Sequence, residues 1–275
     1  MKQILWFRRD LRVSDSAILA NAKDEVLPIF IFDKNILDKL KKEDKRVTFI
    51  YKSVLKLKQE LKILGLDLAI FYGTPKEVFE TLKNQGFDSI LCSVDFDNYA
   101  KKRDEEIAKI IPMQTFTDSF ITHPNNCLKA DKNPYKVFTP YYNNLKFIWD
   151  SYKLEEFETN KNLKLISYDF DFIPTLENMG FTKQTLPQFL QKSAYELLED
   201  FEQKIDNYKV DRDFFDKNAT SNLAVHLRFG LISPRQVFNK IKELKARTEN
   251  KEFFIRELFW REFYNYILFH FPKSE

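Results

Sequence analysis

The stretch VTFIYKSVLKLKQELKILGLDLAIF, residues 47–71, decides the fold class of this chain. In its first part, apolar residues recur at steps of three and four, as on the buried side of an amphipathic helix: Val47, Ile50, Val54, Leu57, Leu61 and Leu64. Gly65 comes next, and glycine is the residue type that most often follows the end of a helix. The apolar run Leu66–Phe71 then indicates a buried strand. A helix that leads directly into a buried strand is typical of a parallel sheet covered by helices.

Four more short apolar runs in the first 116 residues indicate strands, at Gln3–Phe7, Val26–Phe32, Ser89–Ser93 and Met113–Phe116. Thr74–Glu77 has the residue order Thr-Pro-Lys-Glu, which predicts a helix that begins with a capping box and a first-turn proline. Strands therefore alternate with helices. We predict an α/β fold with a doubly wound, five-stranded parallel sheet.

The second half of the chain has a different pattern. From about residue 150 to residue 185 the periodicity is lost, as is common in connections between domains. Helical patterns then continue to the end: Ser221–Phe229 stops at Gly230, and Ser233–Gln236 has the order of another capping box. We predict three parts, which are an α/β domain (1–130), a connector (131–185) and an all-helical segment (186–275).

Composition excludes several classes of protein. The chain has 275 residues, 44% of them hydrophobic and 31% charged, which excludes intrinsic disorder. No run approaches the roughly 20 uncharged apolar residues that cross a membrane. The start of the chain has no signal-peptide pattern, so we predict a cytoplasmic protein without membrane contact.

The scarce residue types exclude several kinds of site. Two cysteines and three widely separated histidines predict no metal centre. The five glycines are never closer than eight residues, whereas dinucleotide fingerprints and Walker loops need two glycines within about five residues. Any nucleotide must therefore be held in another way. The net charge of +3 leaves nucleic-acid binding open.

Two candidate stretches have simple structural alternatives. Arg8–Arg12 follows the first strand, at the sheet edge where doubly wound folds bind ligands. The alternative is a solvated loop whose charges pair with one another. Tyr135–Tyr141 is an aromatic-rich segment that we interpret as a loop packed against the protein.

The turn Thr220–Ala224 combines hydroxyl groups with the free backbone N–H groups of a helix start, and Tyr208 precedes it. Such a turn could hold an anion, for example a pyrophosphate, with help from the helix dipole. The alternative is that Thr220 or Ser221 only caps its own helix.

The stretch Glu257–Tyr264 places four functional side chains at helical spacing. We expect Glu257, Trp260, Arg261 and Tyr264 along one face, where they offer an acceptor, stacking planes and a cation. The alternative is that Trp260 lies in the core and Glu257 pairs with Arg261.

Five motifs in order resemble the DNA photolyase/cryptochrome family. They are Trp6–Arg12 (WFRRDLR), Tyr135–Pro140 (YKVFTP), Thr220–Leu223 (TSNL), Leu231–Arg235 (LISPR) and Trp260–Tyr264 (WREFY). The match spans the whole chain, and the last two motifs are the most specific to the family.

The resemblance implies light-driven repair of cyclobutane pyrimidine dimers in UV-damaged DNA. In that reaction, excited reduced FAD donates an electron to the dimer, the ring opens and the electron returns. The resemblance implies that FAD lies in the helical domain, next to Tyr208, Thr220, Ser221, Asn222, Leu223, Ala224, Phe254 and Glu257. It also implies DNA contacts by Arg212, Glu257, Trp260, Arg261 and Tyr264, with Glu257 and Trp260 acting in catalysis.

A second, antenna chromophore is also implied, and the first 130 residues resemble the antenna-binding domain of the family. Some positions depart from the usual pattern: Asp15-Ser16, Ala224 and Phe254. Ala100 stands near a point where folate-binding members carry a carboxylate, so a folate antenna is not expected. A deazaflavin, another flavin or no antenna remain open.

Family members continue well beyond the WREFY helix, so we expect this chain to be an N-terminal portion with an incomplete helical FAD-binding domain. Its three tryptophans cannot form the usual tryptophan relay. We therefore expect the isolated chain to hold FAD weakly and to be inactive, and the full-length protein to be a monomer. Two alternatives are a cryptochrome-like photoreceptor without repair activity and a non-catalytic nucleotide-binding module. The lesion type also remains open.

Overall fold

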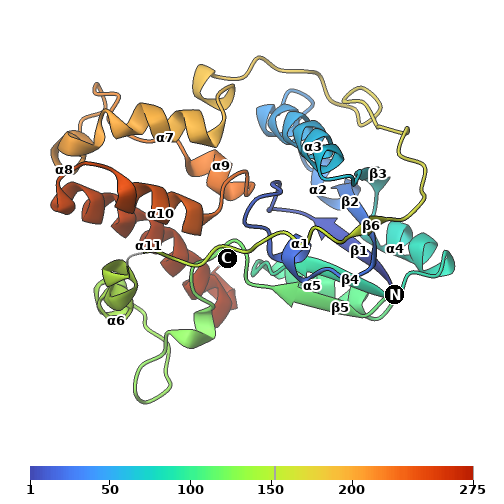
Figure 1. The fold of residues 1–275 in the computed structure, drawn as a ribbon, viewed down its shortest axis with the longest axis horizontal. Coiled ribbons are helices and arrows are strands. Elements are labelled where there is room, and N and C mark those ends of the chain that lie inside the picture. Colours follow the sequence, from blue (N-terminus) through green and yellow to red (C-terminus); the bar gives the residue numbers. More distant parts are fainter. Residues whose placement is uncertain (152, 275) are drawn as a thin grey trace.

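The computed structural model describes residues 1–151 and 153–274. Its N-terminal part is a parallel sheet of five strands in the order β3-β2-β1-β4-β5 (Figure 1). These strands are β1 (Lys2–Phe7), β2 (Glu25–Asp33), β3 (Ala69–Gly73), β4 (Ser89–Ser93) and β5 (Met113–Phe116). A two-residue strand that we did not predict, β6 (Lys164–Leu165), pairs with the start of β2. The predicted five-stranded parallel sheet is confirmed.

The predicted start of the third strand is wrong by three residues. We expected a strand over Leu66–Phe71, whereas β3 begins at Ala69. Leu66 and Leu68 are buried in the core but lie in the loop before the strand. Apolar periodicity reports burial, and a buried loop of two leucines has the same pattern as the start of a strand.

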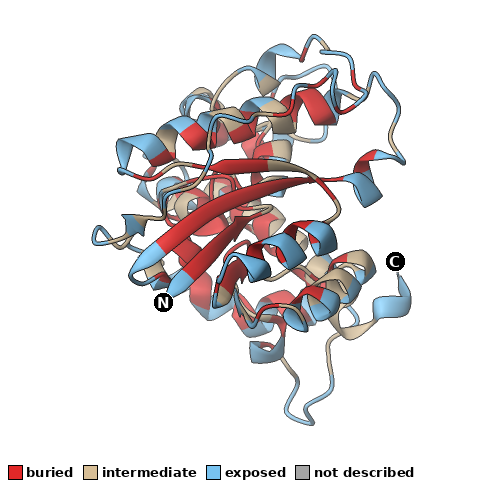
Figure 2. Ribbon diagram, turned by 90° about the vertical axis from the view of Figure 1, so that its right-hand side faces the viewer, coloured by how far each residue is buried: buried red, intermediate tan, exposed pale blue. Residues whose placement is uncertain are grey.

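Helices cover both faces of the sheet, as expected for a doubly wound fold. Helices α1 (Ala17–Asn21) and α3 (Lys45–Ile63) pack on one face, and α4 (Pro75–Asn84) and α5 (Asn98–Ala108) pack on the other. In β1, Leu5 and Phe7 enter the first core and Ile4 and Trp6 the second, because successive side chains of a strand point to opposite faces. Figure 2 shows the buried strands between these helices. A short helix, α2 (Lys34–Leu37), follows β2.

A third core holds the helical part together. Its main members are α6 (Phe138–Asp150), α7 (Ala194–Glu202), α10 (Pro234–Glu243) and the long α11 (Thr248–His270). The short helices are α8 (Tyr208–Asp211), α9 (Ala224–Arg228) and the 3₁₀ turns η1 (Pro124–Asn126), η2 (Gln188–Leu190), η3 (Ile205–Asn207) and η4 (Pro272–Ser274). The predicted helical segment is present. The three predicted domain ranges stay a prediction.

Local helix signals were accurate where a cap forms. Thr74 and Ser233 both form complete capping boxes, with Glu77 and Gln236 respectively. Gly65 has a φ of 75° just after α3. These signals depend on neighbouring residues alone, so they can be recognised without the tertiary structure.

The interpretation of residues 135–141 as a loop is wrong from Phe138 onward. Helix α6 begins at Phe138 and buries Tyr141, Tyr142 and Leu145 at steps of three and four. Pro140 lies in the first turn, where its missing N–H has no intrahelical partner to lose. The proline made the segment look like a loop, although it is compatible with a helix start.

Candidate functional site

A cavity of about 430 Å³, here called pocket A, lies between the sheet and the helical part. The sheet side contributes residues that follow β1, β4 and β5, and the helical side contributes α9, α11 and the turn before α9. The full lining is Arg8, Arg9, Ser93, Val94, Asp95, Ser119, Phe120, Tyr208, Thr220, Ser221, Leu223, Ala224, Leu227, Arg228, Phe254, Glu257, Leu258, Arg261 and Asn265. Pocket A therefore has a polar wall from the sheet and a mixed wall from the helices.

Pocket A brings together eight of the residues that the sequence singled out. They are Tyr208, Thr220, Ser221, Leu223, Ala224, Phe254, Glu257 and Arg261. Four others do not line it: Arg212, Asn222, Trp260 and Tyr264. The roles predicted for all twelve residues stay predictions.

The turn before α9 differs in detail from the expected helix start. We predicted a helix over Ser221–Phe229, whereas α9 begins at Ala224 because Asn222 has a φ of 58°, which a right-handed helix does not allow. The residue that precedes α9 is Leu223, and no side chain caps the helix. The alternative that Thr220 or Ser221 caps its own helix is therefore wrong. Within the turn, Thr220 Oγ1 donates to Asn222 Oδ1 at 3.5 Å and Ser221 Oγ accepts from the N–H of Leu223 at 3.4 Å, and both residues line pocket A.

Glu257 has a different partner from the one expected. Its Oε1 accepts a hydrogen bond from Nη1 of Arg212 at 2.5 Å, so the pairing of Glu257 with Arg261 is wrong. Arg261 instead donates to the carbonyl oxygens of Ser119 at 2.7 Å and Leu227 at 3.3 Å. Arg261 thus ties α11 to the loop after β5 and to α9. The side chain of Glu257 is 38% exposed and lines pocket A.

Trp260 and Tyr264 do not line pocket A, whereas Glu257 and Arg261 do. Trp260 stacks on Phe138 of α6, with the ring centres 3.7 Å apart and the planes 9° from parallel. Three residues turn a helix by about 300° and four by about 400°, so the four positions span about 100° around the axis, with Trp260 and Arg261 at opposite edges of one broad face. The indole is half-buried, and its ring centre is 5.7 Å from that of Tyr264, which is itself 66% exposed.

The arginines after β1 are not a solvated loop. Arg8 pairs with Asp104 at 2.6 Å and its side chain is 7% exposed. Arg9 pairs with Asp95 at 2.6 Å and with Asp97 at 3.0 Å. These partners lie about 90 residues away, which is why the sequence suggested only local pairing. Arg8 and Arg9 both line pocket A.

Arg228, at the end of α9, is a site residue that the sequence did not single out. It lines pocket A, and its guanidinium group has no ion pair or hydrogen bond to another residue in the described part of the chain. Burial lowers its pKa, yet guanidinium groups remain charged at all ordinary pH values. Its only local signal was a basic residue in the last turn of a short helix, which is common in proteins without a ligand.

A second cavity, pocket B, has a volume of about 480 Å³ and lies beyond the ends of β1 and β2. It shares Arg8, Arg9, Asp95, Ala224 and Arg228 with pocket A. The rest of its lining is Trp6, Phe7, Phe30, Ile31, Asp33, Ile36, Leu40, Arg46, Ile50, Asp97, Tyr99, Arg103, Val225 and Phe229. The carboxyl ends of the strands in a doubly wound sheet are where ligands bind.

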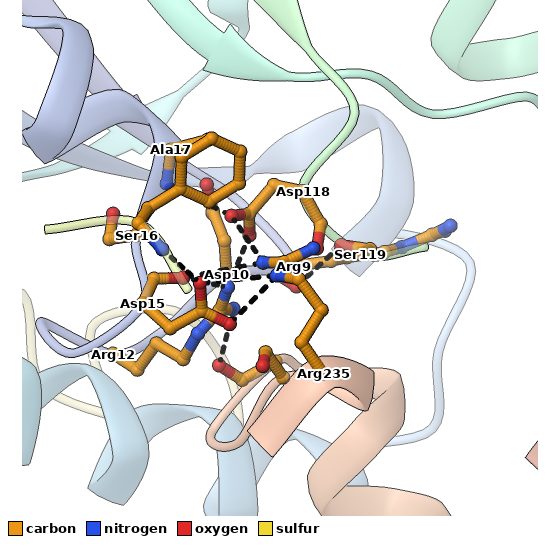
Figure 3. Close-up of polar contacts among 12 residues, drawn as sticks. Arg9, Asp10, Arg12, Asp15, Ser16, Ala17, Asp118, Ser119 and Arg235 are labelled. Carbon is orange, nitrogen blue, oxygen red and sulfur yellow. Dashed lines mark hydrogen bonds and ion pairs between the residues drawn. The ribbon is translucent and has the colours of Figure 1, made fainter. Parts of the chain in front are cut away.

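Buried ion pairs and hydrogen bonds connect the sheet side and the helical side of pocket A (Figure 3). Arg12 pairs with Asp118 at 2.7 Å and donates to the carbonyl oxygen of Gly230 at 3.2 Å, and Arg235 of α10 pairs with Asp15 at 2.9 Å. Arg235 also donates to the carbonyl oxygens of Asp118 and Phe120, at 3.0 and 3.1 Å. Burial, together with the nearby Asp118, raises the pKa of Asp10 to about 6. The second half of the WFRRDLR motif is therefore structural, whereas its first half faces the pockets.

The structure gives no sign of two other kinds of site. Among the described residues, no three histidine, cysteine, aspartate or glutamate side chains are grouped so that they could hold a metal ion. Over the same residues, no helix is both long enough and apolar enough to span a bilayer.

Comparison with known proteins identifies a family. The sequence profile of the DNA photolyase family matches residues 3–159. A deoxyribodipyrimidine photo-lyase from Alkalihalophilus pseudofirmus is 29% identical over 311 residues, which cover 98% of this chain and 60% of the relative. An archaeal photolyase from Sulfolobus tokodaii, solved with two FAD molecules, superimposes with a TM-score of 0.79 at 27% identity, over 99% of this chain and 60% of that one. A Synechocystis cryptochrome has the same TM-score of 0.79 at 17% identity, over 98% of this chain and 62% of its own, and shares the fold. The chain thus spans about 60% of the length of the curated relatives that it matches.

Proposed function

Because this chain belongs to the DNA photolyase family, we propose that pocket A binds FAD and that the protein repairs cyclobutane pyrimidine dimers in DNA under light. One observation carries the proposal. The hydroxyl-bearing turn at Thr220 and Ser221 and the carboxylate of Glu257 come from separate helical segments, and they line the same cavity. The five ordered motifs and the named photo-lyase relatives support the same assignment.

The residues of pocket A fit the chemistry of FAD. A pyrophosphate needs several donors, and the hydroxyls of Thr220 and Ser221 and the guanidinium of Arg228 provide them. Aromatic and sugar portions need apolar walls, which Leu223, Phe254 and other side chains supply. The cavity volume of about 430 Å³ also lies in the range of roughly 300–1,000 Å³ that is usual for ligand pockets.

Each side chain would have a separate task in this reaction. Reduced FAD, when bound and excited by light, supplies the electron that opens the dimer ring. Burial raises the pKa of Tyr208 to about 12, so its hydroxyl stays protonated and can donate a hydrogen bond. Glu257 can accept hydrogen bonds from pyrimidine edges, provided that it exchanges its partner Arg212 for the lesion. Arg212, once released, would be free to contact a DNA phosphate.

DNA recognition would use the aromatic side of α11. Enzymes that act on a base in a duplex extrude it, and a damaged, poorly stacked base costs less to extrude. Trp260 already stacks on Phe138, so its ring is held in place, and the exposed ring of Tyr264 lies beside it. Stacking of a base on such rings contributes about 1–3 kcal/mol. We assign Trp260 and Tyr264 to lesion binding on this basis.

Pocket B is our proposed site for a second chromophore. Its apolar lining, for example Phe30 and Ile50, suits a flat aromatic ring, and Arg46 and Arg103 suit a polar or anionic edge. The Sulfolobus tokodaii photolyase is described as holding two FAD molecules, with a light-harvesting role implied for one of them.

Removal of both turn hydroxyls tests the proposal. In the protein at its natural length, Thr220→Ala with Ser221→Ala should weaken FAD binding about tenfold or more, because each lost hydrogen bond to a charged group contributes about 1.5–3 kcal/mol. Bound flavin is measured by absorbance after dialysis, and repair is measured on a thymine-dimer oligonucleotide under blue light. Thr81→Ala with Ser151→Ala, which removes two hydroxyls outside both pockets, is the matched control.

Two outcomes would contradict the proposal in different ways. Unchanged FAD binding in the turn variant would remove pocket A from cofactor binding. Full flavin binding without any repair in the unmodified protein would favour the photoreceptor alternative. Glu257→Gln should lower the repair yield, since the carboxylate is assigned to the lesion, and it should weaken FAD binding less than the turn variant does, because glutamine keeps a hydrogen-bond acceptor.

A further inference from the structure

Two side chains of pocket B can give up an electron easily. Among its described lining residues, Trp6 and Tyr99 carry an indole and a phenol, and the other aromatic rings are phenylalanines. An excited chromophore next to an indole or phenol can take an electron from it, and the light energy is then lost. A pocket that keeps a chromophore excited must suppress this reaction. The surroundings of these two rings are therefore informative.

Two cations face the indole of Trp6. The guanidinium carbon of Arg8 is 4.7 Å from the centre of the Trp6 ring, and that of Arg103 is 4.8 Å away. Trp6 is 2% exposed, so water screens these charges weakly. Cations at such distances interact favourably with a neutral ring, and they repel a ring that has become a radical cation.

Negative charge near Trp6 only partly balances the two arginines. One carboxylate, that of Asp104, pairs with both of them, at 2.6 Å to Arg8 and 2.9 Å to Arg103. Burial raises the pKa of the neighbouring Cys92 thiol to about 11, so it stays neutral. Arg8, Arg103 and Asp104 together thus carry one net positive charge beside the indole, and Asp95, which also acts on both arginines, is paired with Arg9 at 2.6 Å.

Tyr99 has a different environment and must be treated separately. Its hydroxyl donates a hydrogen bond to the Asp33 carboxylate, which could accept the proton if the phenol were oxidised. Arg103 and Lys39 lie 5.7 and 5.9 Å from its ring centre, farther than the two arginines lie from Trp6. The protective arrangement is therefore centred on Trp6.

We propose that Arg8 and Arg103 disfavour the oxidation of Trp6, so that a chromophore in pocket B keeps its excitation. The proposal rests on the assignment of pocket B to a second chromophore. The suppressed step moves one electron from the indole to the excited chromophore and leaves an indole radical cation. Return of that electron would restore both partners and release the energy as heat. The adjacent positive charges raise the free energy of the radical cation and so slow the first transfer.

The test uses a tethered flavin, so that it does not depend on natural affinity. A thiol-reactive flavin is attached to Ile36→Cys, which lines pocket B at a side chain that is 43% exposed, whereas Cys92 and Cys127 are buried. All proteins carry Tyr99→Phe to remove the second electron source. The readout is the fluorescence lifetime of the flavin, with circular dichroism as the check of folding.

Arg103→Gln should shorten the lifetime about twofold or more, because a positive charge at about 5 Å in a poorly screened site acts strongly on the ring. Trp6→Phe added to Arg103→Gln should restore the lifetime, and Arg103→Lys should preserve most of it. Arg247→Gln removes the same charge at an exposed side chain that lines neither pocket, and it should leave the lifetime unchanged. Trp6→Phe alone should leave the parent lifetime unchanged, because Trp6 is already protected.

Three results would overturn the inference. They are an unchanged lifetime in Arg103→Gln, a shortened lifetime that Trp6→Phe does not restore, and a clear lengthening by Trp6→Phe alone. Titration with untethered FMN and FAD separates this inference from the proposed function. If neither binds in pocket B while the tethered lifetimes follow the expected order, a flavin is excluded as the second chromophore and the role of the arginines stands.

Discussion

Glu262 illustrates how single buried charges shape this protein. Its side chain is 2% exposed, and its carboxylate accepts hydrogen bonds from the backbone N–H groups of Ile121 at 3.0 Å and Thr122 at 3.4 Å. Burial raises the pKa of Glu262 to about 7, against an ordinary value of 4.5, although Arg261 and the two N–H groups oppose the shift. The WREFY motif therefore contains a structural carboxylate beside its candidate functional residues.

The raised pKa of Glu262 predicts a pH dependence of stability. The folded protein holds a proton on Glu262 that the unfolded chain has lost between about pH 4.5 and pH 7, so this contribution to stability is present at acid pH and disappears as the pH rises through 7. Relative to the wild type, Glu262→Gln should therefore gain up to about 3 kcal/mol in the free energy of unfolding between pH 4.5 and pH 8. Urea unfolding at several pH values measures this difference. Glu80→Gln, at an exposed carboxylate, is the control, and parallel curves for wild type and Glu262→Gln would contradict the assignment.

One aromatic face of helix α6 packs against α11 and so positions α6 in the helical part. Phe138 stacks on Trp260, and Tyr142 packs edge-on against Phe259 of α11. Tyr141 contacts Phe263 and Tyr266. The Phe138 contact also fixes the position of the Trp260 ring, which we assign to lesion binding.

Loss of the Phe138 ring should loosen this support. Phe138→Ala removes a side chain that is 3% exposed, and such substitutions cost about 3–5 kcal/mol in the free energy of unfolding. It should also make Trp260 more accessible to acrylamide, measured by quenching of its fluorescence in a background with Trp6→Phe and Trp149→Phe. Phe147→Ala removes the same ring from the same helix at a position that is 67% exposed, so its effect should stay within about 0.5 kcal/mol. Equal effects of the two variants would show that the stack contributes nothing.

The whole molecule depends on a close contact between the loop after β1 and the turn after α9. Gly230 has a φ of 65°, and a Cβ atom there would lie 2.1 Å from the carbonyl oxygen of Arg9. The N–H of Leu11 donates to the carbonyl oxygen of Phe229 at 3.1 Å in the same region. This contact and the buried Arg235–Asp15 pair bring the sheet wall and the helical wall of pocket A together.

Gly230→Ala should therefore be among the most destabilising single changes in the chain. We expect a loss of more than about 3 kcal/mol in the free energy of unfolding, because the new methyl group clashes with backbone atoms and the left-handed φ adds strain. Gly86→Ala is a matched control, since Gly86 has a φ of 82° with no atom within 4 Å of the added Cβ, and it should cost only about 1–2 kcal/mol. Thermal or urea unfolding measures both. Similar losses would mean that the close backbone approach at Gly230 is unimportant.

The sequence by itself determined the elements whose signals are local. The apolar stripe of α3, the two capping boxes and the short apolar strands all depend on residues within a few positions, and so does the order of the family motifs. Most of the candidate site could be named in the same way, since the hydroxyl turn and Glu257 lie in recognisable motifs. The pattern failed where a local signal had two meanings, as at Pro140 and Leu66.

Only the tertiary structure decided how the charged and aromatic side chains are paired. The partner of Glu257 is Arg212, which is 45 residues away, and the partner of Trp260 is Phe138, which is more than a hundred residues away. Arg228 is a candidate site residue only because it lines both pockets, which the tertiary structure brings together. Such pairings depend on how distant segments approach one another in space. The spacing of residues along the chain does not reveal which segments meet, because many different sequences can form the hydrophobic cores that bring them together.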